Sequence, residues 1–316
     1  MTTDSARISQ LGNEPKRNGS PAPRWALRIV RTGVLVYLGV LLVLFELQDH
    51  LIFPGSATQG QRDAMIAGSE GLQLLSLRSG DGVPIAAIFG KALQPDGAEF
   101  ADAANRPTVI FLYGNGACMA YCTDIFQIIR KLGLNVIIPD FEGYGMSGGK
   151  PSEKGCYAAA DAAYDYLLSR SDVDPRKIVP IGWSLGAAAA IDLASRRPVM
   201  GIVTISAFTN LPDMAKQIVR WFPMSFILKY RFDNIGKLAG ITCPILIIHG
   251  TEDELVPFTM APLLAAAAKG NVQRYNVQGA GHNDVFEIGG EQLGKRVEQF
   301  ISGLPLPPGL PTSVGR

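Results

Sequence analysis

The sequence of 316 residues has few of the residues that build metal and disulfide sites. It contains three histidines and four cysteines, and no two cysteines are spaced as C-x-x-C. This scarcity excludes a disulfide scaffold, a zinc ribbon and the H-E-x-x-H metalloprotease motif. Cys118 and Cys122 are four residues apart, and we interpret them as small buried apolar side chains rather than as a metal or redox pair.

An excess of one charge is also missing. The chain has 29 Lys and Arg against 28 Asp and Glu, so its net charge is only +1. This balance argues against a nucleic-acid-binding protein, which would carry a basic excess. Hydrophobic residues make up 47% of the chain, which is enough for a sizeable core and excludes wholesale disorder. We therefore expect a folded protein with no nucleic-acid partner and no required protein partner.

One long apolar run lies near the N-terminus, at residues 25–47. It is uninterrupted over 33–45, and it reaches membrane-spanning length if Arg28 and Arg31 extend toward the headgroups. Basic residues gather before the run, whereas Arg62 is the only basic residue among the twenty that follow it. The positive-inside rule then predicts a single-pass anchor with a cytoplasmic N-terminus. The catalytic part would lie on the opposite side, periplasmic or luminal.

A cleaved signal peptide and an interfacial helix are the alternatives for this run. Signal-peptide cleavage needs small residues after the apolar stretch, and residues 45–49 (Phe-Glu-Leu-Gln-Asp) offer none. The division of the chain that we predict is a flexible cytoplasmic tail at 1–24, a transmembrane anchor at 25–47, a linker at 48–70, a catalytic domain at 71–303 and a flexible tail at 304–316.

Short apolar runs alternate with helix-like sequence through the rest of the chain. A turn sequence, Ser-Gly-Asp-Gly at 79–82, separates the first two runs and predicts a hairpin. Continuous apolar strands separated by helices predict an α/β fold with a mostly parallel central sheet covered by helices on both faces. The predicted strands are 72–78, 83–89, 107–113, 134–139, 178–183, 201–205, 244–249 and 272–277.

A G-x-S-x-G motif occupies residues 182–186, where a predicted strand ends and a helix begins. This context predicts a sharp turn that exposes Ser184 as a nucleophile, with glycines at 182 and 186 because larger side chains would collide with neighbouring backbone. The N-terminus of the following helix would supply partial positive charge where an oxyanion develops, and the backbone N–H of Leu185 would donate to it.

A serine nucleophile needs a base, and His282 is the best placed of the three histidines. It lies in a glycine-rich loop after the last predicted strand, and the order Ser, acid, His is typical of this motif. His50 adjoins the membrane run, and His249 precedes the candidate acids. The acids at 252–254 (Glu-Asp-Glu) follow a strand, and spacing alone does not choose among them.

A second oxyanion donor is expected from the loop after the first parallel strand, Tyr-Gly-Asn-Gly at 113–116. We assign it to the backbone N–H of Asn115, with Gly116 as the next choice. A G-x-G-x-x-G sequence at 143–148 is not a dinucleotide site, because Gly-Lys-Pro follows it where a helix would have to begin. No metal or organic cofactor is expected.

These motifs together make the chain resemble the alpha/beta-hydrolase superfamily, and in particular its small membrane-anchored serine hydrolases, whose catalytic domain is similar to that of S33-type serine aminopeptidases. The resemblance covers 71–303, and beyond the serine motif it rests on 140–155 (DFEGYGMSGGKPSEKG), 249–257 (HGTEDELVP) and 279–284 (GAGHND). By this resemblance the acid of the triad is Asp253.

Two positions depart from the family pattern. Tyr113 stands where the family usually has histidine before the oxyanion glycine, and Glu142 stands where it commonly has arginine. Both departures concern loop geometry and substrate preference more than the type of reaction. Residues 207–241, an insertion between strands, contain an aromatic-rich stretch that would contact an apolar acyl chain if the insertion forms a small cap.

The expected function is therefore hydrolysis of an ester or thioester with an apolar acyl part, through Ser184, His282 and Asp253 and an acyl-enzyme. The substrate would be a small acyl compound. The alternatives are an acyltransferase or serine aminopeptidase with the same triad, and a non-catalytic anchored binding module that has kept the fold.

Overall fold

The computed structural model describes residues 24–219 and 221–307, and the chain forms two compact units that meet between residues 44 and 45. The first unit carries most of helix α1 (Arg24–Ile52), whose apolar side chains are exposed and which is long and apolar enough to cross a membrane. The tail predicted at 1–24 lies outside the described residues except for Arg24. The tail predicted at 304–316 is described only to residue 307.

A single eight-stranded sheet organises the second unit. Its strands are β1 (Gln73–Arg78), β2 (Pro84–Gly90), β3 (Thr108–Leu112), β4 (Asn135–Pro139), β5 (Ile178–Trp183), β6 (Ile202–Ile205), β7 (Ile245–Gly250) and β8 (Val272–Val277). The order across the sheet is β1-β2-β4-β3-β5-β6-β7-β8. Only the β1–β2 and β2–β4 pairs are antiparallel, which confirms the mostly parallel sheet with an antiparallel edge.

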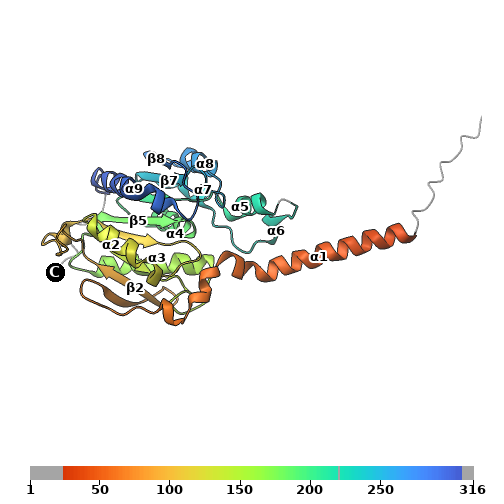
Figure 1. Ribbon diagram of the computed structural model, residues 1–316, viewed down its shortest axis with the longest axis horizontal. Helices are drawn as coiled ribbons and strands as arrows, with labels where there is room; N and C mark the ends of the chain where they lie inside the picture. The colour runs from red at the N-terminus through yellow and green to blue at the C-terminus, as the bar shows by residue number, and fades with distance from the viewer. Residues whose placement is uncertain (1–23, 220, 308–316) are drawn as a thin grey trace, which may run out of the picture. The chain divides into compact units, whose positions relative to one another are not determined.

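Helices cover both faces of the sheet (Figure 1). One face is covered by α2 (Thr123–Lys131) and α9 (Val285–Ser302), and the other by α3 (Glu153–Ser169), α4 (Leu185–Arg196), α7 (Asn234–Leu238) and α8 (Met260–Ala267). Because β3 to β7 are covered on both sides, every residue of β3, β4, β6 and β7 is buried. Short 3-10 helices occur at Ala103–Asn105, Met119–Cys122 and Pro175–Lys177.

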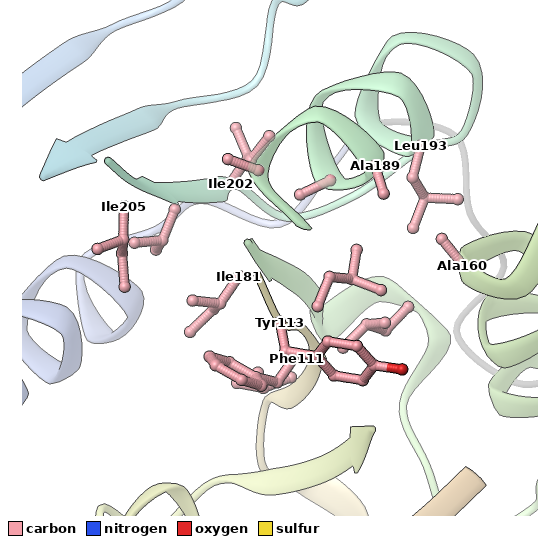
Figure 2. Packing of buried hydrophobic residues seen from close by; sticks show 14 of the residues in the cluster. Phe111, Tyr113, Ala160, Ile181, Ala189, Leu193, Ile202 and Ile205 are labelled. Atoms are coloured by element: carbon pink, nitrogen blue, oxygen red, sulfur yellow. The ribbon is translucent and has the colours of Figure 1, made fainter. Parts of the chain in front are cut away.

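Small side chains set the packing of the central helices. The run of alanines at 187–190 in α4 is fully buried, so this helix lies close to the sheet. Figure 2 shows Leu193 of α4 and Ala160 of α3 pointing toward one another, and the two helices are in contact. Ser152 caps α3 by accepting a hydrogen bond from the N–H of Gly155.

The segment at 48–70, which the sequence presents as a linker, packs into the sheet unit. It contains the end of α1 and two short 3-10 helices, Pro54–Thr58 and Arg62–Ala64. Phe53 is fully buried and lies edge-on to Tyr230, with ring centroids 5.0 Å apart. The composition of 48–70 gives little sign of this attachment, which rests on the buried Phe53 ring and on hydrogen bonds such as the one from the N–H of Gly145 to the Thr58 hydroxyl at 3.0 Å.

Candidate active site

The serine at position 184 sits in a strained turn between β5 and α4. Its φ and ψ angles are 54° and −115°, a conformation that L residues rarely adopt. A Cβ atom added at Gly186 would lie 1.9 Å from the carbonyl oxygen of Leu112, and one at Gly182 would lie 2.2 Å from that of Gly186. Both glycines are therefore required for the tight strand-to-helix turn, which holds Ser184 at the carboxyl end of the sheet.

The structure brings Ser184, His282 and Asp253 together from three separate loops. His282 Nε2 lies 3.0 Å from Ser184 Oγ, and His282 Nδ1 lies 2.9 Å from Asp253 Oδ2 and 3.1 Å from its Oδ1. Because a carboxylate only accepts hydrogen bonds, Nδ1 carries the ring proton and Nε2 is left to accept one from the serine hydroxyl. All three residues are buried, so little water competes for these bonds.

Asp253 is the only one of the three neighbouring acids that is buried, whereas Glu252 and Glu254 are exposed. Its Oδ1 accepts hydrogen bonds from the backbone N–H groups of Leu255 and Val256. Burial opposes ionisation of this carboxyl, but hydrogen bonds from two histidines and from the backbone outweigh it and hold the pKa of Asp253 well below its usual range. The carboxylate stays charged and fixes the imidazole of His282.

A second histidine, His249, lies behind Asp253 and is fully buried. Its Nε2 lies 2.8 Å from the carbonyl oxygen of Val256 and donates to it, and the same nitrogen lies 3.4 Å from Asp253 Oδ2. His249 therefore braces the turn that carries the acid and does not reach the serine. The order Ser, acid, His disfavours His249 as the base, and the signal for its bracing role is its position four residues before Asp253 at the end of β7.

The backbone of the loop after β3 is held in place from two sides. The hydroxyl of Tyr113 donates to Asp140 Oδ1 at 2.9 Å and accepts from the N–H of Phe141 at 3.0 Å. Asp140 also accepts from the N–H groups of Met119 and Met146, at 2.7 and 2.8 Å. Burial raises the pKa of Asp140 to about 6 despite these hydrogen bonds. The Tyr113 hydroxyl thus connects the loop after β3 to the loop after β4.

Asn115 in this loop is attached to the segment that follows α1. Its side-chain amide donates to the carbonyl oxygen of Ile52 at 3.1 Å. The backbone carbonyl oxygen of Asn115 accepts from the N–H of Gly55 at 2.8 Å and from the hydroxyl of Tyr144 at 3.1 Å. The side chain is therefore engaged away from the serine, and only the backbone N–H of Asn115 is left as the donor we assign to the oxyanion. The sequence held no signal for the attachment to Ile52.

Sequence similarity relates this chain to known proteins. A model described as the alpha/beta hydrolase fold matches residues 107–227. An uncharacterised protein of Mycobacterium tuberculosis is 31% identical over 277 residues, which cover 88% of this chain and 95% of that protein. The chain belongs to the alpha/beta hydrolase superfamily. Membership of this superfamily supports a hydrolase.

Other relatives match a smaller part of this chain. Alpha/beta hydrolase domain-containing protein 17B of Xenopus laevis is 35% identical over 204 residues, 62% of this chain and 66% of that protein. Protein 17C of Homo sapiens is 34% identical over 208 residues, 63% of this chain and 59% of that protein. An esterase of Pyrococcus furiosus has a TM-score of 0.60 at 21% identity, with 74% of this chain and 90% of that chain covered, and shows the fold alone.

The insertion of this alpha/beta hydrolase, 207–241, forms α5 (Leu211–Ile218), α6 (Met224–Ile227) and α7. In the aromatic-rich stretch of this insertion, Trp221 is 89% exposed and Phe226 is 91% exposed. An apolar cavity of about 590 Å³ lies elsewhere, between α2 and α9, and no triad residue lines it.

Within the described part of the hydrolase, no three side chains of His, Cys, Asp or Glu are grouped as a metal site would require. The four cysteines are unpaired thiols, and Cys118 and Cys122 are buried. Burial raises the pKa of Cys118, so this thiol is held in its neutral form.

Proposed function

We propose that this protein is a membrane-anchored serine hydrolase that cleaves an ester or thioester. The observation that supports it most directly is the continuous chain of hydrogen bonds from Ser184 through His282 to Asp253. Such a chain activates a hydroxyl only when the imidazole is neutral on the serine side and is oriented by a carboxylate, and the distances fit both conditions.

In the proposed reaction, Ser184 Oγ attacks the acyl carbonyl while His282 Nε2 takes its proton. The negative charge that develops on the carbonyl oxygen is stabilised by the backbone N–H groups of Leu185 and Asn115 and by the N-terminus of α4. His282 then protonates the leaving alcohol or thiol, and an acyl-enzyme remains. Water, activated by the same imidazole, releases the acid and restores the serine.

The anchor is assigned to α1, whose length and composition suit a bilayer. By the positive-inside rule, the basic residues up to Arg31 favour a cytoplasmic N-terminus and a catalytic unit on the periplasmic or luminal side. A catalytic unit held at a membrane meets substrates that partition into lipid, and this position favours substrates with an apolar acyl part.

Turnover of a short p-nitrophenyl ester and of an aliphatic thioester, measured on the full chain, tests the proposal. We expect Ser184→Ala to lower kcat by about 10⁴-fold or more without loss of the fold. Ser206→Ala is the matched control, because Ser206 is also buried with positive φ, at the end of the neighbouring strand β6, and it is outside the triad. Equal activity of the Ser184→Ala and Ser206→Ala variants would refute the assignment of Ser184 as the nucleophile.

Two further substrates separate the alternatives. Cleavage of an aminoacyl p-nitroanilide faster than of the ester would favour an aminopeptidase, and transfer of the acyl group to an added alcohol faster than to water would favour an acyltransferase. If the wild type turns over none of these compounds and resists acylation, the anchored binding module is the better description.

A further inference from the structure

Two highly exposed aromatic side chains lie in the middle of the 207–241 insertion. Among the large hydrophobic residues that the structure describes, Phe226 at 91% and Trp221 at 89% are the most exposed. Figure 1 shows α5 and α6 set apart from the strands and from the helices that flank them. We name residues 221–226 the aromatic tip. Exposed aromatic residues gathered on one projection indicate an interaction surface.

The base of the insertion is tied to the rest of the unit by hydrogen bonds. Glu153 of α3 accepts hydrogen bonds from the backbone N–H groups of Arg231 and Phe232, at 2.7 and 2.9 Å. The N–H of Leu211 donates to the carbonyl oxygen of Arg231 at 2.8 Å, which joins the two ends of the insertion. The ring of Phe232 is fully buried between them.

The same base touches the residues at which the chain leaves the apolar run. The N–H of Lys229 donates to Gln48 Oε1 at 2.7 Å, and its ammonium lies 3.7 Å from Asp49 and 4.8 Å from the centre of the Phe45 ring. Because Gln48 and Asp49 directly follow the predicted membrane span and Phe45 lies in its last turn, the base of the insertion lies beside the bilayer surface if α1 is the anchor.

Ser184 lies close to the strand end from which the insertion begins. The N–H of Ser184 donates to the carbonyl oxygen of Ile205, the last residue of β6, and the insertion begins two residues later. The insertion also carries five basic and two acidic residues, a net charge of +3 in a chain whose total is +1. A basic segment with exposed tryptophan and phenylalanine is the composition that binds the interface of an anionic bilayer.

We propose that the aromatic tip inserts Trp221 and Phe226 into the boundary between headgroups and acyl chains of the bilayer that holds α1. This contact orients the side of the unit that carries Ser184 toward acyl substrates that reside in the membrane. The inference rests on the anchor in the proposed function, and it adds a second, interfacial contact that the anchor alone does not require.

Tryptophan fluorescence of the full chain in nanodiscs containing an anionic lipid tests the contact directly. The probe is phosphatidylcholine brominated near the headgroup end of its acyl chains, which quenches indoles at that depth. The emission of Trp221 is the difference between the wild type and Trp221→Phe, so that Trp25 and Trp183 cancel. We expect this difference to fall at least twofold in brominated lipid. An unchanged difference overturns the proposal, whether or not the protein hydrolyses any ester.

Kinetics give an independent test. We expect the Trp221→Ser/Phe226→Ser double variant to raise the KM for a long-chain acyl ester in the same nanodiscs by about tenfold, with kcat and the hydrolysis of a soluble short ester unchanged. Leu263→Ser, which alters a 53% exposed leucine on α8, is the matched control and should change neither. Equal losses on the soluble and the embedded ester would overturn the membrane contact while leaving the hydrolase in place.

Discussion

The substitution Gly186→Ala tests the geometry of the serine turn with a single methyl group. The new Cβ would lie 1.9 Å from the carbonyl oxygen of Leu112 and 2.6 Å from that of Tyr113. Carbon–oxygen contacts are about 3.3 Å or longer, so α4 must move away from β3 by roughly 1.4 Å. Strand β3 is paired with strands on both sides and is the more rigid partner. The displacement therefore falls on the turn that carries Ser184.

We expect two measured consequences of Gly186→Ala. Strain of this kind costs about 1–3 kcal/mol of unfolding free energy in urea titrations. A displacement of about 1 Å at a nucleophile lowers kcat by roughly 100-fold on a short p-nitrophenyl ester.

The control is Gly294→Ala in α9, where the added Cβ would meet Leu132 at an ordinary 3.6 Å. That variant should keep full activity and gain up to about 1 kcal/mol from helix propensity. Wild-type turnover by Gly186→Ala would refute the claim that this glycine sets the position of the serine.

Three further outcomes follow from the site. In urea titrations, the free energy of unfolding of Ser184→Gly should be about 1 kcal/mol higher than that of Ser184→Ala, because only glycine relieves the strained φ of 54°. The low pKa of Asp253 means that its charged form stabilises the fold above pH ~4, and this contribution fades as pH falls toward the folded pKa, so the stability deficit of Asp253→Asn in urea should be largest at pH 7 and shrink by pH 3. Asn115→Ala removes the hydrogen bond to Ile52 and should cost about 1 kcal/mol of unfolding free energy and lower kcat severalfold; unchanged values would show that this attachment does not support the loop.

Much of the fold could be predicted because apolar runs and turn residues determine the structure of neighbouring residues. Continuous apolar runs such as 107–113 and 178–183 correspond to buried parallel strands, and the turn at 79–82 joins the antiparallel pair β1 and β2. The cap of α3 by Ser152 is also a local feature, because it depends only on a neighbouring N–H group.

The features that the sequence did not reveal depend on contacts between distant residues. The kink inside α9 at Gly290, where φ is 46°, is one example. The attachment of Asn115 to Ile52 is another, because neither residue type signals a partner 63 positions away.

The exposure of Trp221 and Phe226 is another feature that the sequence did not reveal. Aromatic residues in an insertion have the same composition whether they cover a site or face outward, and only their packing distinguishes the two. The choice of Asp253 likewise came from the family resemblance, because burial, which separates it from Glu252 and Glu254, is not encoded in spacing.

The central claim is that Ser184 is a nucleophile activated by His282. Covalent labelling by a fluorophosphonate, with intact mass and peptide mapping on the full chain, tests it most directly. We predict one adduct per chain, located on Ser184, with labelling absent in Ser184→Ala and slowed at least 100-fold in His282→Gln. An adduct on another residue, or labelling that survives in Ser184→Ala, would contradict the account.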